Sequence, residues 1–246
     1  QKAFSDTPRL AVQGVSRLPS ASLPPEEVRA ANVIFIADPI SAATAAALRE
    51  LALEGKTLVV VPKGPEAASS LGALLGRDAV RLGEMRPASY AMLAEIDFQH
   101  PLFAPFADPR FSDFTKIHVW KYRKLDPLTV PDARVVAKFD SGDPALLEVP
   151  AGRGRIFVLT TGWHPDDSQL AVSSKFVPLL WSLLELGGGV ATPPTQFVVG
   201  DKVSLAAFGA ATTVRGPGGE SVALAANATE FAQTVQPGIY DVQGAA

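Results

Sequence analysis

Four polar residues follow two of the apolar runs in this sequence and are the best candidates for chemistry. His164, Asp166 and Asp167 come shortly after a run that ends at Thr160, and Lys63 comes shortly after another. Open α/β sheets bind ligands at the carboxyl ends of their strands. An imidazole beside two carboxylates could orient a proton or hold a metal, and a lysine near a helix N-terminus could bind an anion. We therefore expect any ligand-binding site to use Lys63, His164, Asp166 and Asp167.

The same residues also fit a structural role, and the sequence leaves both interpretations open. Pro165 and Asp166 are suited to a turn that caps a helix. Lys63 is equally suited to a solvated loop. No further ligand lies at metal-binding spacing from His164, so no metal site is predicted.

The turn after the apolar run 58–61 lacks a nucleophile. It reads Pro62-Lys63-Gly64-Pro65, and the sequence contains no cysteine. Ser69 and Ser70 lie a turn further along the expected helix, away from the position where a strand-to-helix elbow presents a nucleophile. We therefore predict no catalytic residue and no enzymatic activity.

No cofactor is predicted either. Gly152 and Gly154 join two expected strands, and no helix follows them to receive a pyrophosphate, so they are not a dinucleotide loop. His100 and His118 have no second ligand at metal-binding spacing. We expect both to be ordinary surface or packing histidines.

The charge pattern argues against nucleic acid as a partner. The formal net charge is -3 at pH 7, and no block of five or more like charges occurs. The one basic cluster, 116–124, alternates its charged residues with Ile117, Val119, Trp120 and Tyr122. This alternation predicts a strand with one solvated cationic face.

The first part of the sequence alternates strands with helices. The expected strands are 9–15, 33–37 and 56–61, and the expected helices begin at Pro24, span 42–54 with Ser41 as N-cap and Gly55 as C-cap, and span 65–75. The continuously apolar run 33–37 is typical of a parallel strand that is covered on both faces. The alternation predicts an α/β fold with a doubly wound, mostly parallel sheet of flavodoxin-like type.

Residues 88–125 break this alternation. They are rich in phenylalanine and proline and predict an insertion with an antiparallel hairpin. The sheet is expected to resume with strands 134–139, 145–149 and 155–160, joined by turns at 140–143 and 152–154. A helix at 173–186 is expected to close this domain.

A different kind of sequence follows the segment 190–195. The triple glycine 187–189 and the double proline 193–194 cannot continue a helix or a strand. Short β-type runs come next, at 197–199, 203–205, 212–214, 222–224 and 239–242, with a hairpin turn at 216–219. We expect two domains, residues 1–190 and 191–246, of which the second is a small all-β sandwich.

The sequence begins at Gln1 and contains no apolar run of about 18 residues, so we expect no membrane span within it. The lack of cysteine is compatible with an oxidising compartment. We expect the sequence to be a part of a longer protein.

Three segments carry a family resemblance. They are the run 140–148, which reads Asp-Ser-Gly-Asp-Pro-Ala-Leu-Leu-Glu, the run from Gly152 to Gly162, and the run 176–180; the segment 100–103, His-Pro-Leu-Phe, fits the same pattern. Together they resemble the class I glutamine amidotransferase-like domain of BatA-like, aerotolerance-type bacterial membrane proteins. The likeness covers residues 9–187, and its motifs consist mainly of turn and packing residues.

This resemblance implies a setting for the chain. BatA-like proteins are anchored by transmembrane helices, often carry a von Willebrand A domain, and are partners of MoxR-type ATPase systems. The implied location is the extracytoplasmic, periplasmic part of an inner-membrane protein, with the membrane segments outside this sequence. The β-domain would then be the neighbour that precedes a return to the membrane.

The resemblance also sharpens the functional expectation. Glutamine amidotransferases of this fold use a cysteine at the elbow and a histidine in a His-Pro-Glu segment, whereas this chain has Lys63-Gly64 and His164-Pro165-Asp166. We expect a non-catalytic interaction or scaffold domain with a degenerate amidotransferase-like fold. The alternative is a sensor domain that binds a sugar or an anion at the carboxyl end of the sheet.

Overall fold

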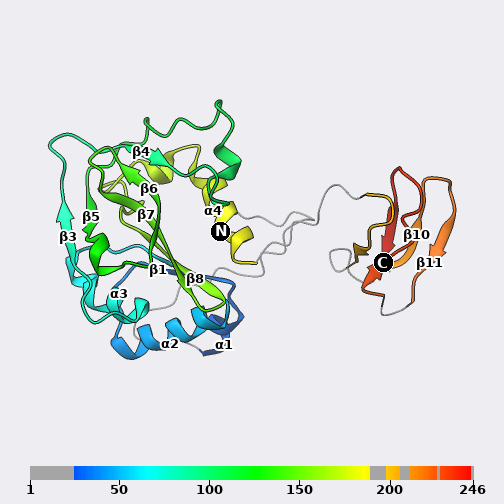
Figure 1. The fold of residues 1–246 in the computed structure, drawn as a ribbon, viewed down its shortest axis with the longest axis horizontal. Helices are drawn as coiled ribbons and strands as arrows, with labels where there is room; N and C mark the ends of the chain where they lie inside the picture. Colours follow the sequence, from blue (N-terminus) through cyan, green and yellow to red (C-terminus); the bar gives the residue numbers. More distant parts are fainter. Residues whose placement is uncertain (1–24, 189–197, 206–210, 226–227, 245–246) are drawn as a thin grey trace. The chain divides into compact units, whose positions relative to one another are not determined.

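The computed structural model describes residues 25–188, 198–205, 211–225 and 228–244 (Figure 1). The chain divides into two units, residues 1–190 and 191–246. The strand expected at 9–15 and the segment 190–195 lie outside the described residues. In the part of the chain that is described, no helix is both long and apolar enough to cross a membrane.

A six-stranded sheet in the order β1-β2-β8-β7-β6-β4 forms the centre of the first unit. Its strands are β1 (Val33–Ile36), β2 (Thr57–Val60), β4 (Leu93–Ile96), β6 (Arg134–Phe139), β7 (Pro144–Ala151) and β8 (Gly154–Leu159). The helices are α1 (Pro25–Ala30), α2 (Ala42–Glu54), α3 (Ala68–Leu75) and α4 (Phe176–Leu186). This arrangement confirms the α/β class predicted from the sequence.

The sheet is mixed. The pairs β1–β2 and β2–β8 are parallel, as the strand–helix alternation predicted. The pairs β8–β7, β7–β6 and β6–β4 are antiparallel. For β6–β7 and β7–β8 the reversal follows from the tight turns at 140–143 and 152–153, because a connection of a few residues can join only antiparallel neighbours.

Helix α2 shows how local sequence sets its boundaries. The Ser41 side chain accepts a hydrogen bond from the Thr44 N–H at 3.1 Å. Gly55 ends the helix at φ 125°, and its N–H donates to the Ala52 carbonyl. Both caps were predicted from the residue types.

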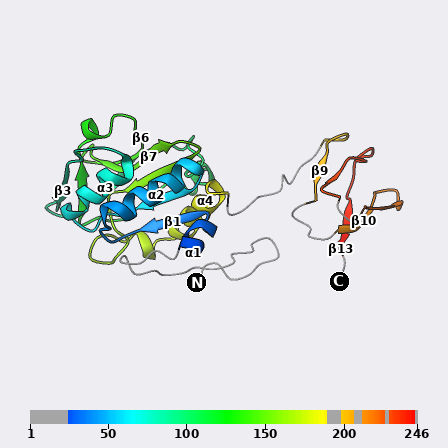
Figure 2. The same cartoon turned by 90° about the horizontal axis from the view of Figure 1, so that it is seen from below.

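Two apolar layers cover the two faces of the sheet. Figure 2 shows helix α2 lying across the strands of the sheet. Alternate strand residues face opposite sides, so Leu58 and Val60 of β2 belong to one layer and Val59 to the other. Helices α2 and α3 cover the first face. Helix α4 and the phenylalanine-rich segment, with Phe103, cover the second.

Strand β1 is less covered than its sequence predicted. It lies at the edge of the sheet and pairs only with β2 among the described strands. Phe35 is 42% exposed and meets the Trp163 ring edge-on at 5.8 Å between centroids. The expectation of a strand covered on both faces was therefore wrong, because an apolar run does not distinguish a central strand from an edge strand.

The phenylalanine-rich segment does not contain the predicted hairpin. Strand β4 joins the edge of the main sheet beside β6. Strand β5 (Tyr122–Leu125) pairs antiparallel with β3 (Leu82–Met85), which precedes the segment, and forms a two-stranded ribbon. Strands β4 and β5 therefore pair with different strands and not with each other, and the local sequence carries no signal for this pairing.

The second unit consists of two small antiparallel sheets. Their strands are β9 (Val203–Ser204), β10 (Ala211–Arg215), β11 (Ser221–Ala223), β12 (Glu230–Phe231) and β13 (Asp241–Gly244), in the orders β11-β10-β13 and β12-β9. Leu205, Val214 and Phe231 form its core. The strand expected at 197–199 is wrong over its described part, where Val198 instead starts a turn held by Asp201.

Gly154 and Gly83 provide a matched test of close packing. A Cβ at Gly154 would overlap the carbonyl oxygens of Ala52 and Lys56, whereas a Cβ at Gly83 would meet only the Lys124 carbonyl oxygen, at 4.0 Å. We expect Gly154→Ala to lower the free energy of unfolding by about 1–3 kcal/mol. Gly83→Ala should leave it unchanged or raise it by up to about 1 kcal/mol. Urea unfolding followed by circular dichroism measures both, and equal losses would contradict this account.

Candidate functional site

The carboxyl ends of β2 and β8 are the place where ligands bind in open α/β folds. Here a third segment occupies that place. The backbone N–H of Arg123, in β5, donates to the carbonyl of Thr160, which directly follows β8, at 2.8 Å. The Arg123 guanidinium donates to the carbonyl of Lys63, which follows β2. Strand β5 therefore crosses the ends of both parallel strands.

The Arg123 side chain is held by a buried ion pair. Its Nη1 lies 3.2 Å from the Oδ2 of Asp167, and the two side chains are 1% and 9% exposed. The other carboxylate oxygen of Asp167 lies 2.7 Å from the Nζ of Lys121. Arg123 Nε has no hydrogen-bond partner among the described residues. Both charges are thus neutralised inside the protein.

The loop that carries Asp167 is shaped around this ion pair. The N–H groups of Asp167 and Ser168 donate to the His164 carbonyl at 2.8 and 3.0 Å, which folds the segment into a turn. A Cβ at Gly162 would overlap Asp167 Oδ2, so the approach of the carboxylate requires glycine there. The Asp167 carbonyl in turn accepts from the N–H of Trp120.

The structure separates the four residues that the sequence suggested as ligands. His164 and Asp166 have side chains that are 72% and 81% exposed, with Nδ1 and Oδ2 3.5 Å apart. The Nζ of Lys63 pairs with Asp38 at 2.5 Å, and both side chains are more than half exposed. Only Asp167 is buried, and its carboxylate is already used.

Sequence reasoning missed Arg123. The basic cluster 116–124 was expected to be a strand with a solvated cationic face, and that expectation was wrong. Only its end, from Tyr122, is a strand, and Arg123 is almost completely buried. One signal in the sequence could have found it. The two adjacent acids at 166–167 can form ion pairs with a basic residue of 116–124, and the apolar neighbours of that residue indicate that it is buried.

No nucleophile is poised at the elbow after β2. Ser70 is buried and its hydroxyl donates to the Ala67 carbonyl at 3.1 Å, while Ser69 is exposed one residue earlier. Over the described residues, no group of three or more histidine and carboxylate side chains could hold a metal ion. Among the described residues at this edge of the sheet, the buried polar side chains therefore take part in charge pairing and backbone hydrogen bonds.

The other two histidines have structural surroundings. His100 is buried, and its Nε2 lies 3.0 Å from Glu148 Oε2 while its Nδ1 accepts from the Leu102 N–H. Glu148 also binds Arg155 at 2.9 Å. His118 stacks on Tyr90 with the ring centroids 3.9 Å apart. Both contacts agree with the packing role that the sequence suggested.

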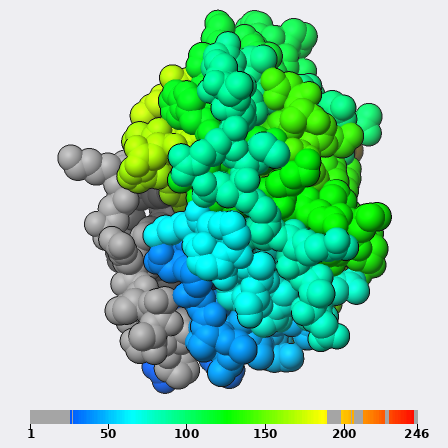
Figure 3. All heavy atoms as spheres, turned by 90° about the vertical axis from the view of Figure 1, so that its left-hand side faces the viewer, coloured from blue at the N-terminus to red at the C-terminus, as the bar shows by residue number. Residues whose placement is uncertain are grey.

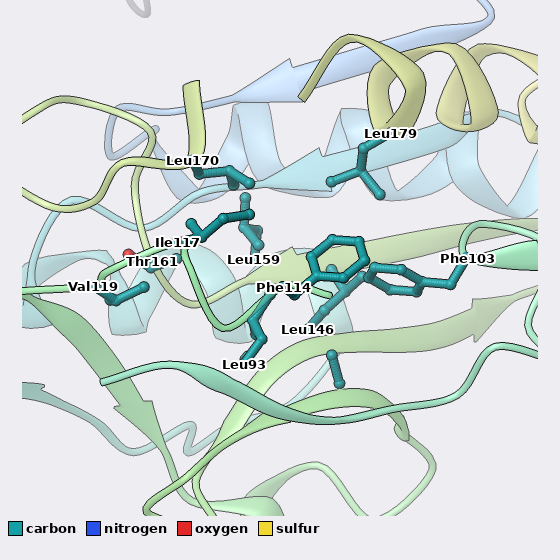
Figure 4. A pocket seen from close by; sticks show the side chains of 12 residues that line it. Leu93, Phe103, Phe114, Ile117, Val119, Leu146, Leu159, Thr161, Leu170 and Leu179 are labelled. Carbon is teal, nitrogen blue, oxygen red and sulfur yellow. The ribbon is translucent and has the colours of Figure 1, made fainter. Parts of the chain in front are cut away.

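A small cavity lies within the apolar layer beneath the phenylalanine-rich segment (Figure 4). Its volume is about 30 Å³, and Phe103, Phe114, Leu146 and Leu179 are among the residues that line it. Thr161 is the one polar residue of the lining, and its hydroxyl donates to the Lys121 carbonyl. A void of this size and polarity is a packing defect and has no room for a substrate.

A larger, open hollow of about 680 Å³ lies beside β5. The charged residues that line it include Arg81, Lys124, Asp126 and Asp143. Asp143 accepts from the Tyr122 hydroxyl at 2.7 Å and pairs with Lys124 at 2.9 Å. Burial alone would raise the pKa of Asp143, but these two contacts outweigh it and lower the pKa.

No protein-family model matches the chain, and no curated protein matches it in sequence. Solved structures similar to it include a cytoplasmic protein of Salmonella typhimurium, 16% identical with a TM-score of 0.48 over 68% of this chain and 76% of that chain. A ThuA-like protein of Parabacteroides merdae is 16% identical, with a TM-score of 0.43 over 68% and 73%. A β-galactosidase of Bacillus circulans is 11% identical, with a TM-score of 0.42 over 81% of this chain and 31% of that enzyme. Each likeness concerns the fold alone.

The buried ion pair makes a sharp mutational prediction. Asp167→Asn leaves the Arg123 charge buried without a counter-ion and should lower the free energy of unfolding by about 3–5 kcal/mol. The matched controls His164→Ala and Asp166→Asn alter exposed side chains and should change it by less than about 0.5 kcal/mol. Urea unfolding measures all three, and a loss in Asp167→Asn no larger than in the controls would refute the role of the pair.

Tyr122 should make stability depend on alkaline pH. Burial, with the nearby Asp143 charge, raises its pKa to about 12 from 10.0. The folded protein thus holds this proton more tightly, and the resulting stabilisation is complete below pH 10 and is lost as the pH rises toward 12. Tyr122→Phe should therefore cost about 2 kcal/mol at pH 8 and less at pH 11. Urea unfolding at both pH values tests this, and a difference that stays constant would count against it.

Proposed function

We propose that the chain is a non-catalytic interaction or scaffold domain. The observation that carries this proposal is the Arg123–Asp167 ion pair, which fills the space at the carboxyl ends of β2 and β8. In an enzyme with this arrangement of strands, that space would hold the substrate and the reacting groups. Here a ligand would have to displace a buried, paired guanidinium, which is strongly unfavourable.

The finer identity that we propose follows the resemblance of the segments 140–148, 152–162 and 176–180. On that basis the chain is the extracytoplasmic part of a BatA-like membrane protein whose anchoring segments lie outside this sequence. Its partners would be a von Willebrand A domain and components of a MoxR-type ATPase system. Biolayer interferometry with a purified BatA-like von Willebrand A domain tests this assignment, and the absence of saturable binding would overturn it.

A sensor domain that binds a sugar or an anion remains the second candidate. The open hollow of about 680 Å³ favours it, because its volume lies in the range of ligand pockets, roughly 300–1,000 Å³. The residues that would act are those of the hollow, since His164, Asp166 and Lys63 stand apart on the surface and Asp167 is already paired.

The non-catalytic assignment predicts a specific kinetic result. The intact chain should hydrolyse neither glutamine nor p-nitrophenyl acetate above the uncatalysed rate, because no activated nucleophile lies at the elbow. His164→Ala should give the same background rate. Ammonia release and absorbance assays measure both rates. A turnover in the wild type that His164→Ala abolishes would refute the proposal and restore a catalytic role for this histidine.

A further inference from the structure

Strand β1 forms an open edge of the central sheet. It pairs only with β2 among the described strands. The Ile36 carbonyl accepts from the Val61 N–H, which directly follows β2, at 2.9 Å. Neighbouring residues of a parallel strand direct their backbone groups to opposite sides, so the N–H and C=O groups of Val33 and Phe35 face away from β2. These groups can pair with one more strand.

This edge lacks the features that normally protect a free edge from other strands. Such edges usually carry a charged residue or a proline. Strand β1 contains neither, because it consists of valine, phenylalanine and two isoleucines. The Phe35 side chain is nevertheless 42% exposed. The composition of β1 therefore fits a strand that is covered by another segment.

Helix α1 links this edge to the residues that precede it. Val28 of α1 belongs to the same apolar layer as Leu48 of α2 and Leu71 of α3, so the three helices cover the same face of the sheet. Figure 3 shows α2, in blue, beside α3, in cyan. Only residues 31–32 separate α1 from β1. The segment before α1 therefore reaches the sheet through a helix whose face is known.

The handedness of parallel crossovers determines where a strand before α1 can lie. Strand β1, helix α2 and strand β2 form one crossover between parallel neighbours. Such connections are almost always right-handed. Two right-handed crossovers whose helices cover the same face move the chain in the same direction across the sheet. A parallel strand that precedes α1 must therefore lie beyond β1, on the side away from β2.

The segment 9–15, which lies outside the described residues, has the sequence that this position requires. Its aliphatic residues Leu10 and Val12 alternate with smaller or polar ones, as is typical of a strand with one covered and one exposed face. The open edge offers both environments, because α1 covers one face and Phe35 is exposed on the other. Residues 16–24 remain for the connection to α1.

We propose that residues 9–15 form a further parallel strand that docks on β1 and closes this edge of the sheet against a second copy of the chain. Leu10 and Val12 face the layer that α1 covers, and the residues between them face the side of Phe35. The inference concerns how the chain completes its own sheet and is independent of the proposed function.

The pairing in the sheet also specifies which backbone groups bind β1. Val61 belongs to the apolar layer on the α4 side, and its N–H points toward β1. Residues of the opposite face must point the other way in every parallel strand of the sheet. In the docked strand the N–H groups of Leu10 and Val12 therefore point toward β1, and that of Gln13 points to solvent.

Pairs of introduced cysteines test the contact, because the chain contains no cysteine of its own. Dibromobimane joins two thiols only when they are close together. Phe35→Cys is combined with Ala11→Cys or Gln13→Cys, on the same face, and with Val12→Cys, on the opposite face, as the matched control. The faster of the two same-face pairs should cross-link within one chain at least tenfold faster than the control, as measured by mass spectrometry.

Proline substitutions test the hydrogen bonds. Val12→Pro removes an N–H that donates to β1, whereas the matched control Gln13→Pro removes one that points to solvent, where a strand tolerates proline. Hydrogen exchange followed by nuclear magnetic resonance should show the Phe35 amide exchanging at least tenfold faster in Val12→Pro than in the wild type. In Gln13→Pro the rate should stay within threefold of the wild type.

The same experiments identify any other occupant of the edge. Cross-links between chains in place of those within one chain, or a wild type that is dimeric by light scattering, would assign the edge to a second copy and overturn the inference. Equal cross-linking of the same-face and opposite-face pairs, no cross-linking, or unchanged exchange of the Phe35 amide in Val12→Pro would overturn it as well.

Discussion

The contact between Arg123 and Asp167 is the constraint on which the rest of the first unit depends. A buried guanidinium is tolerated only where its charge is paired and its N–H groups are largely satisfied. Three segments therefore meet at Arg123 of β5. The carbonyl of Lys63, after β2, accepts from its guanidinium, and Asp167, in the turn after β8, pairs with it. Gly162 is needed for the carboxylate to reach it. The same contact brings together the segments that follow β2 and β8 at the carboxyl ends of these strands.

Much of the framework could be predicted from the sequence, because local signals specify it. The caps of α2 at Ser41 and Gly55, the apolar runs of β6 to β8 and the turn at Gly152 all express short-range preferences. The partners of β4 and β5 could not be predicted. They depend on pairing between segments far apart in the sequence, which carries no local signature.

The candidate site shows the same division more clearly. We selected His164, Asp166 and Asp167 as candidates because of their residue types and their position after a strand. In the structure only Asp167 is buried, whereas His164 and Asp166 are exposed. Arg123 was expected on a solvated face because the charged residues of 116–124 alternate with apolar ones. Arg123 can be buried because the carboxylate of Asp167, 44 positions away in the sequence, pairs with its guanidinium. The arrangement at this edge therefore depends on pairing between segments far apart in the sequence and not on a linear motif.

Strand β5 links the closed crevice to the open hollow. Neighbouring residues of a strand point to opposite faces, so Arg123 turns toward Asp167 while Tyr122 and Lys124 turn toward Asp143. The buried pair fixes the position of the strand, and the exposed face then presents Lys124 and Asp126 at a set spacing beside Gly83. A rigid strand is a better platform for recognition than a loop, because its side chains lose less entropy on binding. Strand β5 therefore contributes both to the buried ion pair at the carboxyl ends of β2 and β8 and to the exposed face that carries Lys124.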